Sequence, residues 1–294
     1  MTHVTVVIPA LDATATLSAQ LTALQRQRSD VAFEVIVVDN GSTDGTAQLA
    51  RSFDRPDFPV RVVTEHRRGI NYARNSGVGA AEPGIVLLCD ADDEVHDGWV
   101  HALSSSVDEG HWAGGRVDYT GLNSEQTRLI WGAPASSTHR VSEPYVDNTF
   151  GGNCGFTTRM WIAIGGFDVR LSGAGGDENE MFMRAREAGY QMRWVPEALV
   201  DYRLRPGLRN LVRDRYRRGR HQTRWEKTPG GAHLAGTMRP IDTLGRMAKL
   251  VILLPAYAWT PQRRYQWVGS FSRHVGRLVG WWRHRVFPSV DASI

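Results

Sequence analysis

Residues 86–94, Val86-Leu87-Leu88-Cys89-Asp90-Ala91-Asp92-Asp93-Glu94, combine an apolar run with a dense group of carboxylates. The apolar run is typical of a short buried strand. Carboxylates at the end of such a strand repel one another and lose solvation, so a cation beside them stabilises them. Oxygen ligands in an Asp-x-Asp spacing suit a hard divalent ion such as Mg²⁺ or Mn²⁺, which in turn binds phosphate oxygens. The alternative interpretation is an acidic turn that caps the next helix.

Buried strands precede this stretch at intervals along the chain. Apolar, β-branched runs at residues 4–9, 33–38 and 60–63 have the pattern of buried parallel strands. Helical spacing of Leu17, Leu21 and Leu24 predicts a helix within residues 11–27, and a further helix starts after residue 69. Strands that alternate with helices predict an α/β fold, a Rossmann-like and mostly parallel sheet with helices on both faces.

Charged turns follow three of these strands. Asp39 follows the second strand, Arg68 and Arg74 follow the third, and Asp90 follows the fourth. Ligands of parallel sheets bind at the carboxyl ends of the strands, so we expect these side chains to meet at one edge. There, a metal at Asp92 would neutralise a pyrophosphate, the two arginines would add charge-assisted bonds, and Asp39 would accept hydrogen bonds from a base or ribose. The alternatives are Asp39 as a turn former and Arg74 on a solvated helix face.

Four motifs in one order give the chain a specific resemblance. They are Val6 to Ala10, Val37 to Thr46, Gly69 to Asn75 and Asp90 to Asp93. Together they resemble glycosyltransferase family 2, which has a GT-A fold, and the resemblance covers roughly residues 3–203. It implies a GT-A catalytic domain over residues 1–205, a nucleotide-diphosphate sugar donor, a divalent metal (Mn²⁺ or Mg²⁺), and inversion at the anomeric carbon.

The resemblance also implies roles for individual residues. Pro9 and Asp39 would line the nucleotide-base pocket, Asp90 would approach the ribose, and Asp92 would coordinate the metal. Asn153 lies in a passage, residues 151–168, that is similar to the family's floor between donor and acceptor, so it is a candidate acceptor contact. The chain departs from the family's usual residues at Leu11, Asp12 and Asn40, which leaves the nucleotide unspecified.

A second acidic cluster, Asp177-Glu178-Asn179-Glu180, follows a glycine-rich run and opens a predicted helix. Inverting transfer needs a base that removes the proton of the acceptor hydroxyl as its oxygen attacks the anomeric carbon. In the family this base is the second acid of a pair, which by position is Glu178. Asp177 is the alternative base. A third interpretation is that these acids only complement the helix N-terminus.

The composition fits one large α/β domain with an added segment, since the chain has 294 residues and 41% of them are hydrophobic. Cys89 and Cys154 lie far apart in the sequence, so we expect neither a disulfide framework nor a Cys-ligated zinc site, and a reducing cytoplasm is the natural compartment. Met1 leads directly into a predicted strand without a signal-peptide pattern. No apolar run reaches the about 18 residues of a spanning helix.

Charge is unevenly distributed along the chain. Residues 1–200 hold 16 Arg and 26 Asp or Glu, whereas residues 201–294 hold 19 Arg or Lys and 5 Asp or Glu. We therefore expect residues 206–294 to form a basic helical extension, with helices near 208–225, 241–259 and 262–286. Basic helices with Trp and Leu suit an anionic bilayer surface at the inner face of the plasma membrane. The alternative is that the extension only packs onto the domain. No recognised nucleic-acid module is present, so we expect no nucleic-acid partner.

Residues 222–225, Gln222-Thr223-Arg224-Trp225, are similar to a signature of processive polysaccharide synthases. Such synthases carry several spanning helices, which this sequence lacks, so a single sugar addition is expected, with Trp225 as a candidate acceptor-stacking residue. The expected acceptor is a hydroxyl of a glycan, a glycolipid or a small molecule, in bacterial cell-surface polysaccharide or glycolipid assembly. Two alternatives are a sugar-nucleotide pyrophosphorylase, which needs a glycine-rich basic loop that residues 9–16 lack, and a non-catalytic sugar-nucleotide-binding protein, which would not need the acids at 177–178.

Overall fold

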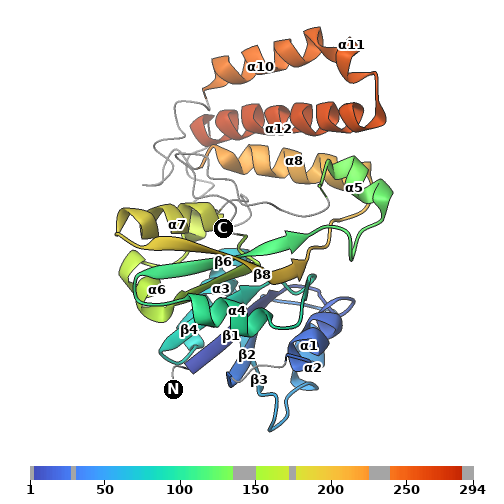
Figure 1. Cartoon of the computed structure of the whole chain (residues 1–294). Coiled ribbons are helices and arrows are strands. Elements are labelled where there is room, and N and C mark those ends of the chain that lie inside the picture. Colours follow the sequence, from blue (N-terminus) through green and yellow to red (C-terminus); the bar gives the residue numbers. More distant parts are fainter. Residues whose placement is uncertain (1–2, 28–30, 135–149, 172–176, 225–238, 287–294) are drawn as a thin grey trace. The chain divides into compact units, whose positions relative to one another are not determined.

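The computed structural model describes residues 3–27, 31–134, 150–171, 177–224 and 239–286 (Figure 1). Their contacts divide the chain into two units. The described parts of the first are residues 3–27, 31–122, 150–169 and 177–203, and those of the second are residues 123–134, 170–171, 204–224 and 239–286. Each unit is described by itself below.

The first unit is built on one sheet of eight strands in the order β3-β2-β1-β4-β7-β6-β8-β5. The strands are β1 (His3–Ala10), β2 (Phe33–Asp39), β3 (Val60–Thr64), β4 (Gly84–Cys89), β5 (Glu94–Val95), β6 (His111–Asp118), β7 (Asn153–Thr157) and β8 (Gln191–Asp201). β7 and β5 run against the others, which all point the same way. The predicted mostly parallel α/β sheet is therefore confirmed.

Helices cover both faces of this sheet, as predicted. They are α1 (Leu17–Gln25), α2 (Thr46–Arg51), α3 (Ile70–Ala80), α4 (Trp99–Ser106), α6 (Thr158–Ile164) and α7 (Asp177–Glu187), and a 3₁₀ turn, η1, spans Val169–Leu171. Alternate side chains of β1 point to opposite faces. Val6 packs in one core with Leu21 of α1 and Trp99 of α4, whereas Val7 packs in the other with Ala73 of α3 and Phe182 of α7.

The strand directions gather distant turns at one edge of the sheet. β1, β2, β3, β4, β6 and β8 all end there, and β7 begins there because Cys89 at the end of β4 pairs with Asn153 at the start of β7. The turn after β4, the residues before β7 and the residues after β8 therefore meet. This edge is the one at which ligands of parallel sheets bind.

Local contacts set the course of two elements. α1 begins at Leu17, within the predicted range 11–27, and before it Thr14 donates to Asp44 through its backbone N–H at 3.0 Å and its hydroxyl at 2.7 Å. Pro196 lies inside one strand, β8, whose register against β6 shifts after Gly115. A Cβ at Gly115 would lie 2.3 Å from the carbonyl oxygen of Ala198, so this irregularity needs a glycine.

A short helix follows β6 in the sequence. α5 (Glu125–Trp131) starts at Ser124, whose hydroxyl accepts a hydrogen bond from the backbone N–H of Thr127, and ends at Gly132 with φ of 63°. Residues 135–149, which come after it, lie outside the described residues.

The second unit contains α5 together with α8 (Leu208–Gln222), α10 (Pro240–Ile252), α11 (Leu254–Tyr257) and α12 (Pro261–Val286). The predicted helical character of the extension is confirmed, but the single helix expected over 241–259 is interrupted at Leu253, just before Pro255. α8 and α12 approach closely: a Cβ at Gly219 would lie 2.0 Å from the carbonyl oxygen of Arg273, and one at Gly276 would lie 2.1 Å from that of Tyr216. Within the described parts of the chain, no helix is long and apolar enough to cross a bilayer.

Glu65 holds the segment that follows β3. Its carboxylate accepts hydrogen bonds from the backbone N–H of Arg67 at 2.8 Å, from Arg67 Nε at 2.9 Å and from the hydroxyl of Ser76 in α3. The bond from the Arg67 side chain is the largest influence, and with the Ser76 bond it outweighs desolvation and lowers the pKa of Glu65 to about 2.

We expect Glu65→Gln to lower the free energy of unfolding by about 1 kcal/mol at neutral pH, since the amide loses the charge-assisted bond to a partly solvated Arg67. The lowered pKa means that this contribution is complete above 4.5, the ordinary value, and fades as the pH falls toward about 2. Urea unfolding of the wild type and of Glu65→Gln across this pH range measures the difference in their free energies of unfolding, with the exposed Glu197→Gln as control. If that difference does not change with pH, the ionised Glu65 carboxylate is not the stabilising group.

Candidate active site

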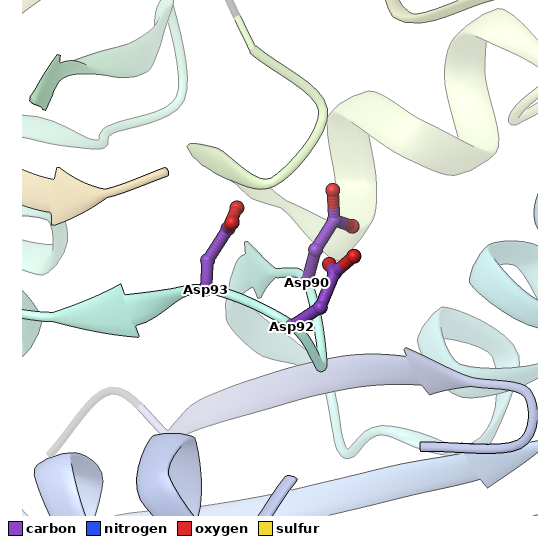
Figure 2. A group of neighbouring side chains, drawn as sticks. All are labelled: Asp90, Asp92 and Asp93. Atoms are coloured by element: carbon purple, nitrogen blue, oxygen red, sulfur yellow. The ribbon is translucent and has the colours of Figure 1, made fainter. Parts of the chain in front are cut away.

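Three carboxylates gather in the turn between β4 and β5. Asp90, Asp92 and Asp93 each offer a ligand oxygen, and these oxygens all lie within 4.8 Å of one another. Figure 2 shows the three side chains projecting from this turn. The arrangement follows from the sheet, because β4 is buried along its length and delivers the acidic turn to the carboxyl edge. The predicted site residues Asp90 and Asp92 are thus neighbours, and Asp93 joins them.

The electrostatics of this cluster favour a bound cation. Asp93 is 1% exposed, and burial, with the charges of Asp90 and Asp92, raises the pKa of Asp93 well above its ordinary value. Among the described residues, Asp93 Oδ2 and Asp90 Oδ1 are buried and receive no hydrogen bond. Carboxylate oxygens that lack donors and repel one another are the donor set that a hard divalent metal requires. The residues present therefore fit a metal.

Arg203, just beyond β8, binds three consecutive residues of the turn. Its backbone N–H donates to Asp93 Oδ1 at 2.8 Å and its Nε to the carbonyl oxygen of Asp92 at 2.8 Å, while Nη2 lies 3.3 Å from Glu94 Oε1. These contacts set the orientation of the Asp93 carboxyl and reduce its desolvation penalty. Nothing in the sequence pattern marks Arg203 for this position, because it depends on the pairing of β5 with β8, in which Glu94 lies opposite Asp201.

Gln20 of α1 holds the same turn from the opposite direction. Its side chain is fully buried; Nε2 donates to the carbonyl oxygen of Asp90 at 3.1 Å, and Oε1 accepts from the backbone N–H of Val95 at 3.0 Å. The amide therefore bridges the two ends of the carboxylate turn. Gln20 is a polar residue in the otherwise apolar buried stripe of α1, and this is the feature of the sequence that could have indicated its role.

Arg74 of α3 joins the carboxylate turn to the start of α7. Its side chain is 6% exposed; Nη1 lies 2.9 Å from Asp177 Oδ2 and Nη2 lies 3.5 Å from Asp90 Oδ1. Phe167 lies beneath the guanidinium, with its ring centroid 5.3 Å from Cζ. Desolvation lowers the pKa of Arg74, but the charges of Asp177, Asp90 and Glu178 outweigh it and raise that pKa above its ordinary value. Arg74 is therefore a buried bridge, which rules out the alternative of a solvated helix face.

Two glycines before β7 let the backbone approach this bridge. A Cβ at Gly151 would lie 2.5 Å from Arg74 Nη2, and one at Gly152 would lie 2.6 Å from Asp90 Oδ2. The pair Gly151-Gly152 thus closes the space around Arg74 and Asp90, and any larger residue would displace one of the two charged groups.

The two candidate bases, Asp177 and Glu178, occupy different surroundings in the first turn of α7. Asp177 is 3% exposed and ion-paired with Arg74, so its carboxylate is committed to a buried contact. Glu178 is less buried and lies close enough to Arg74 to raise the arginine's pKa. The structure therefore brings both acids beside the carboxylate turn through Arg74.

The predicted donor residues Asp39 and Arg68 meet at the turn after β2. Asp39 is 9% exposed, and its Oδ1 accepts from the backbone N–H of Ser42 at 3.0 Å, which is the turn-forming contact. Arg68 Nη2 donates to the carbonyl oxygen of Gly41 at 3.1 Å, so its exposed side chain lies over the same turn. Pro9 is buried within β1, beside this turn in the sheet.

Asn40, which departs from the family's usual residue, has a structural role. Its Nδ2 donates to the carbonyl oxygens of Glu65 at 2.9 Å and Arg67 at 2.8 Å, and its Oδ1 accepts from the backbone N–H of Gly69 at 2.8 Å. The amide joins the turn after β2 to the segment that carries Arg68.

Asn153 has a structural role at the start of β7. It is fully buried; Oδ1 accepts from Trp99 Nε1 at 2.8 Å, and Nδ2 donates to the carbonyl oxygens of Arg116 at 2.8 Å and Ala198 at 3.0 Å. Its amide thus links β6, β7, β8 and α4, while its contact with an acceptor stays a prediction. The other candidate acceptor residue, Trp225, lies outside the described residues.

We expect Arg74→Met to destabilise the protein by about 3–5 kcal/mol, because it leaves buried carboxylates without their cation. Asp177→Asn on the Arg74→Met background should recover part of this loss, since it removes one of those charges. Urea unfolding of the wild type, both single variants and the double variant gives the coupling energy, and the exposed Arg51→Met serves as control. Strictly additive losses would show that the two side chains do not interact.

The sequence of this chain is similar to those of known proteins. The family model described as glycosyl transferase family 2 matches residues 5–165, and one described as the N-terminal domain of galactosyltransferase matches residues 136–204. Glycosyltransferase AglE of Haloferax volcanii is 27% identical over 228 residues, which are 74% of this chain and 72% of that protein. The uncharacterized glycosyltransferase YfnE of Bacillus subtilis is 41% identical over 88 residues, 30% of this chain and 22% of that protein.

Solved structures share the fold. Mannosyltransferase PcManGT from Pyrobaculum calidifontis, in complex with GDP-Man and Mn²⁺, has a TM-score of 0.68 at 20% identity over 96% of this chain and 87% of its own. GalNAc-T7 with UDP, GalNAc and Mn²⁺ has a TM-score of 0.54 at 20% identity over 73% of this chain and 47% of its own. These likenesses concern the GT-A fold. The family model of glycosyl transferase family 2 covers more than half of this chain's residues, so this chain belongs to glycosyltransferase family 2 and is a glycosyltransferase.

Proposed function

We propose that this glycosyltransferase moves a single sugar from a nucleotide-diphosphate sugar to an acceptor hydroxyl, with inversion at the anomeric carbon and with a divalent metal. The observation that carries the proposal is the ion-pair chain Asp90–Arg74–Asp177. It fixes a carboxylate turn suited to a metal and diphosphate beside a pair of acids suited to proton removal. The alternatives of a non-catalytic sugar-nucleotide binder and of a pyrophosphorylase do not account for this second pair of acids.

Asp92 is the proposed principal metal ligand, with Asp90 and Asp93 close enough to contribute oxygens. A divalent metal held by these carboxylates, Mn²⁺ or Mg²⁺, would supply the positive charge that stabilises a diphosphate leaving group. The PcManGT and GalNAc-T7 structures, which share the fold, contain Mn²⁺, and this supports the proposal. Arg203 and Gln20 keep the turn in place, so the carboxylates need little reorganisation when the metal binds.

The donor is proposed to lie along the carboxyl edge of β1, β2 and β4. Pro9 and Asp39 would line the base pocket, Asp90 would approach the ribose, and Arg68 would reach the phosphates from its position over the Asp39 turn. Proteins of the same fold bind GDP-Man and UDP-GlcNAc, which supports a nucleotide-sugar donor. Arg74, being buried and paired, would act on the donor through Asp90 and not by direct phosphate contact.

Glu178 is the proposed catalytic base. Asp177 is held by Arg74 in a buried ion pair, and removing a proton with it would break that pair. Glu178 follows it in the same turn and is less buried. The acceptor oxygen would attack the anomeric carbon while its proton passes to the Glu178 carboxylate, and the nucleotide diphosphate would leave from the opposite face with the bonding electrons.

The acceptor and setting are proposed from the sequence. The acceptor would be a hydroxyl of a glycan, a glycolipid or a small molecule in bacterial cell-surface polysaccharide or glycolipid assembly. The reaction would take place in the cytoplasm, at the inner face of the plasma membrane. Catalysis would take place in residues 1–205, and residues 206–294 would form a basic helical extension.

Glu178→Gln should reduce kcat by about 10²–10⁴-fold while donor binding is kept, because the amide cannot take the acceptor proton. Release of nucleotide diphosphate with an acceptor found by screening measures kcat, and the anomeric configuration of the product, read by NMR, tests inversion. Glu187→Gln, an exposed acid of the same helix, is the matched control. Full activity in Glu178→Gln would remove Glu178 from the mechanism, and a retained configuration would refute inversion.

Isothermal titration of UDP, GDP and dTDP should detect metal-dependent binding of one nucleotide, which EDTA abolishes. Asp92→Asn should weaken that binding by about tenfold or more, because the metal loses its main carboxylate. The exposed Asp97→Asn, five residues along the chain, is the control. Absence of binding to all three nucleotides, with Mn²⁺ present and the fold intact by circular dichroism, would overturn the donor site.

A further inference from the structure

The helix α10 has an inner, buried face and a second, exposed apolar face. The inner one contains the buried Thr243 and Leu250, and Trp267 of α12 donates through Nε1 to the carbonyl oxygen of Leu250 at 2.9 Å. The second is exposed: Ile241 is 72%, Leu244 51%, Val251 58% and Ile252 76% exposed. The spacing of these four residues puts them on one side of the helix. The inner face packs α10 against α12, so packing of this helix does not explain why its other side is apolar.

The exposed apolar surface continues beyond α10. Leu253 and Leu254 at the start of α11 are 38% and 44% exposed, and Trp259 after α11 is 83% exposed. We call Ile241, Leu244, Val251, Ile252, Leu253, Leu254 and Trp259 together the outer face. Contiguous exposed apolar residues of this number are typical of an interaction surface, whereas single ones are ordinary.

Positive charge borders the outer face. Arg246 and Lys249 are exposed on α10, and the side chains of Arg263 and Arg264 donate to the carbonyl oxygens of Ala256 at 3.4 Å and Ala258 at 2.9 Å, so they lie beside α11. Residues 239–283 contain eight Arg or Lys, and their one acid is Asp242. An apolar strip with a basic border is complementary to a surface that is apolar inside and anionic outside.

We propose that the outer face docks on the surface of an anionic lipid bilayer, with α10 and α11 lying in the interface plane. Burial of Ile, Leu and Val among acyl chains supplies the apolar term, and the basic border binds lipid phosphates. Trp259 suits the headgroup level, where indole rings concentrate. The proposal deepens the membrane location proposed above, but it does not depend on the transfer chemistry.

The helices of the second unit differ in what they expose. α8 and α12 pack on each other through Gly219 and Gly276. α10 packs on α12 through its inner face, whereas its outer side and α11 expose the apolar residues. The exposed surface that the proposal uses therefore belongs to α10 and α11.

Sedimentation of the full chain with vesicles tests the proposal. The chain should bind vesicles of phosphatidylcholine mixed with phosphatidylglycerol, bind weakly to phosphatidylcholine alone, and be released by salt. Ile252→Asp should lower the partition coefficient by about tenfold or more. Arg246→Gln with Lys249→Gln should lower it by about fivefold for each charge removed. The matched controls, expected to bind like the wild type, are Ile162→Asp, at an exposed Ile of α6, and Arg51→Gln with Arg55→Gln.

Three outcomes would overturn the proposal. They are no binding of the folded wild-type chain to anionic vesicles, equal binding by Ile252→Asp, and equal losses in Ile252→Asp and Ile162→Asp. Light scattering of the same proteins distinguishes a surface between copies: if Ile252→Asp turns a dimer into a monomer and leaves vesicle binding unchanged, the outer face meets a second chain instead. Nucleotide titration without vesicles is the separate readout of the donor site, so failure of docking and failure of the proposed transfer chemistry are distinguishable.

Discussion

Mutual repulsion among the carboxylates at the end of β4 is the constraint around which the first unit is arranged. Asp93 is almost fully buried next to Asp90 and Asp92, and the desolvation of such a group is expensive unless neighbours compensate it. Arg74 of α3 lies beside Asp90, and Arg203 beyond β8 donates to Asp93, so distant parts of the chain supply the compensation. Gln20 of α1 holds the backbone of the same turn. Two carboxylate oxygens still receive no hydrogen bond among the described residues, which makes the turn suited to an added cation.

Arg74 gives this constraint a wider effect. A buried guanidinium with carboxylates on two sides ties the position of α7 to that of the carboxylate turn, so the first turn of the helix cannot move independently. The same arginine gives the first two acids of α7 different surroundings. Asp177 is buried in the ion pair with Arg74, whereas Glu178 is only partly buried. This difference is the physical basis for proposing Glu178, and not Asp177, as the base.

Much of the fold was predictable because it depends on local pattern. The runs at residues 4–9, 33–38 and 86–89 are buried strands, and the parallel order brings Asp39, Arg68 and Asp90 to one edge as expected. The contacts of Arg203 and Asn153 were not predictable, because they depend on the pairing of β5 with β8 and of β6 with β7 and β8 across long separations. The same limit applies to α10: the sequence predicts a basic helix there, and only the structure shows which of its apolar residues are exposed.

The glycine contacts between α8 and α12 have a consequence for how this chain can vary. Their backbones touch at Gly219 and Gly276, so the pair is specified by its own interface and not by the chain that connects it. Doubling the length of a flexible connection costs only about 0.6 kcal/mol of closure entropy. The residues that connect α8 to α12 include α10 and α11, so we expect this segment to tolerate changes in length and surface composition without loss of the α8–α12 pair.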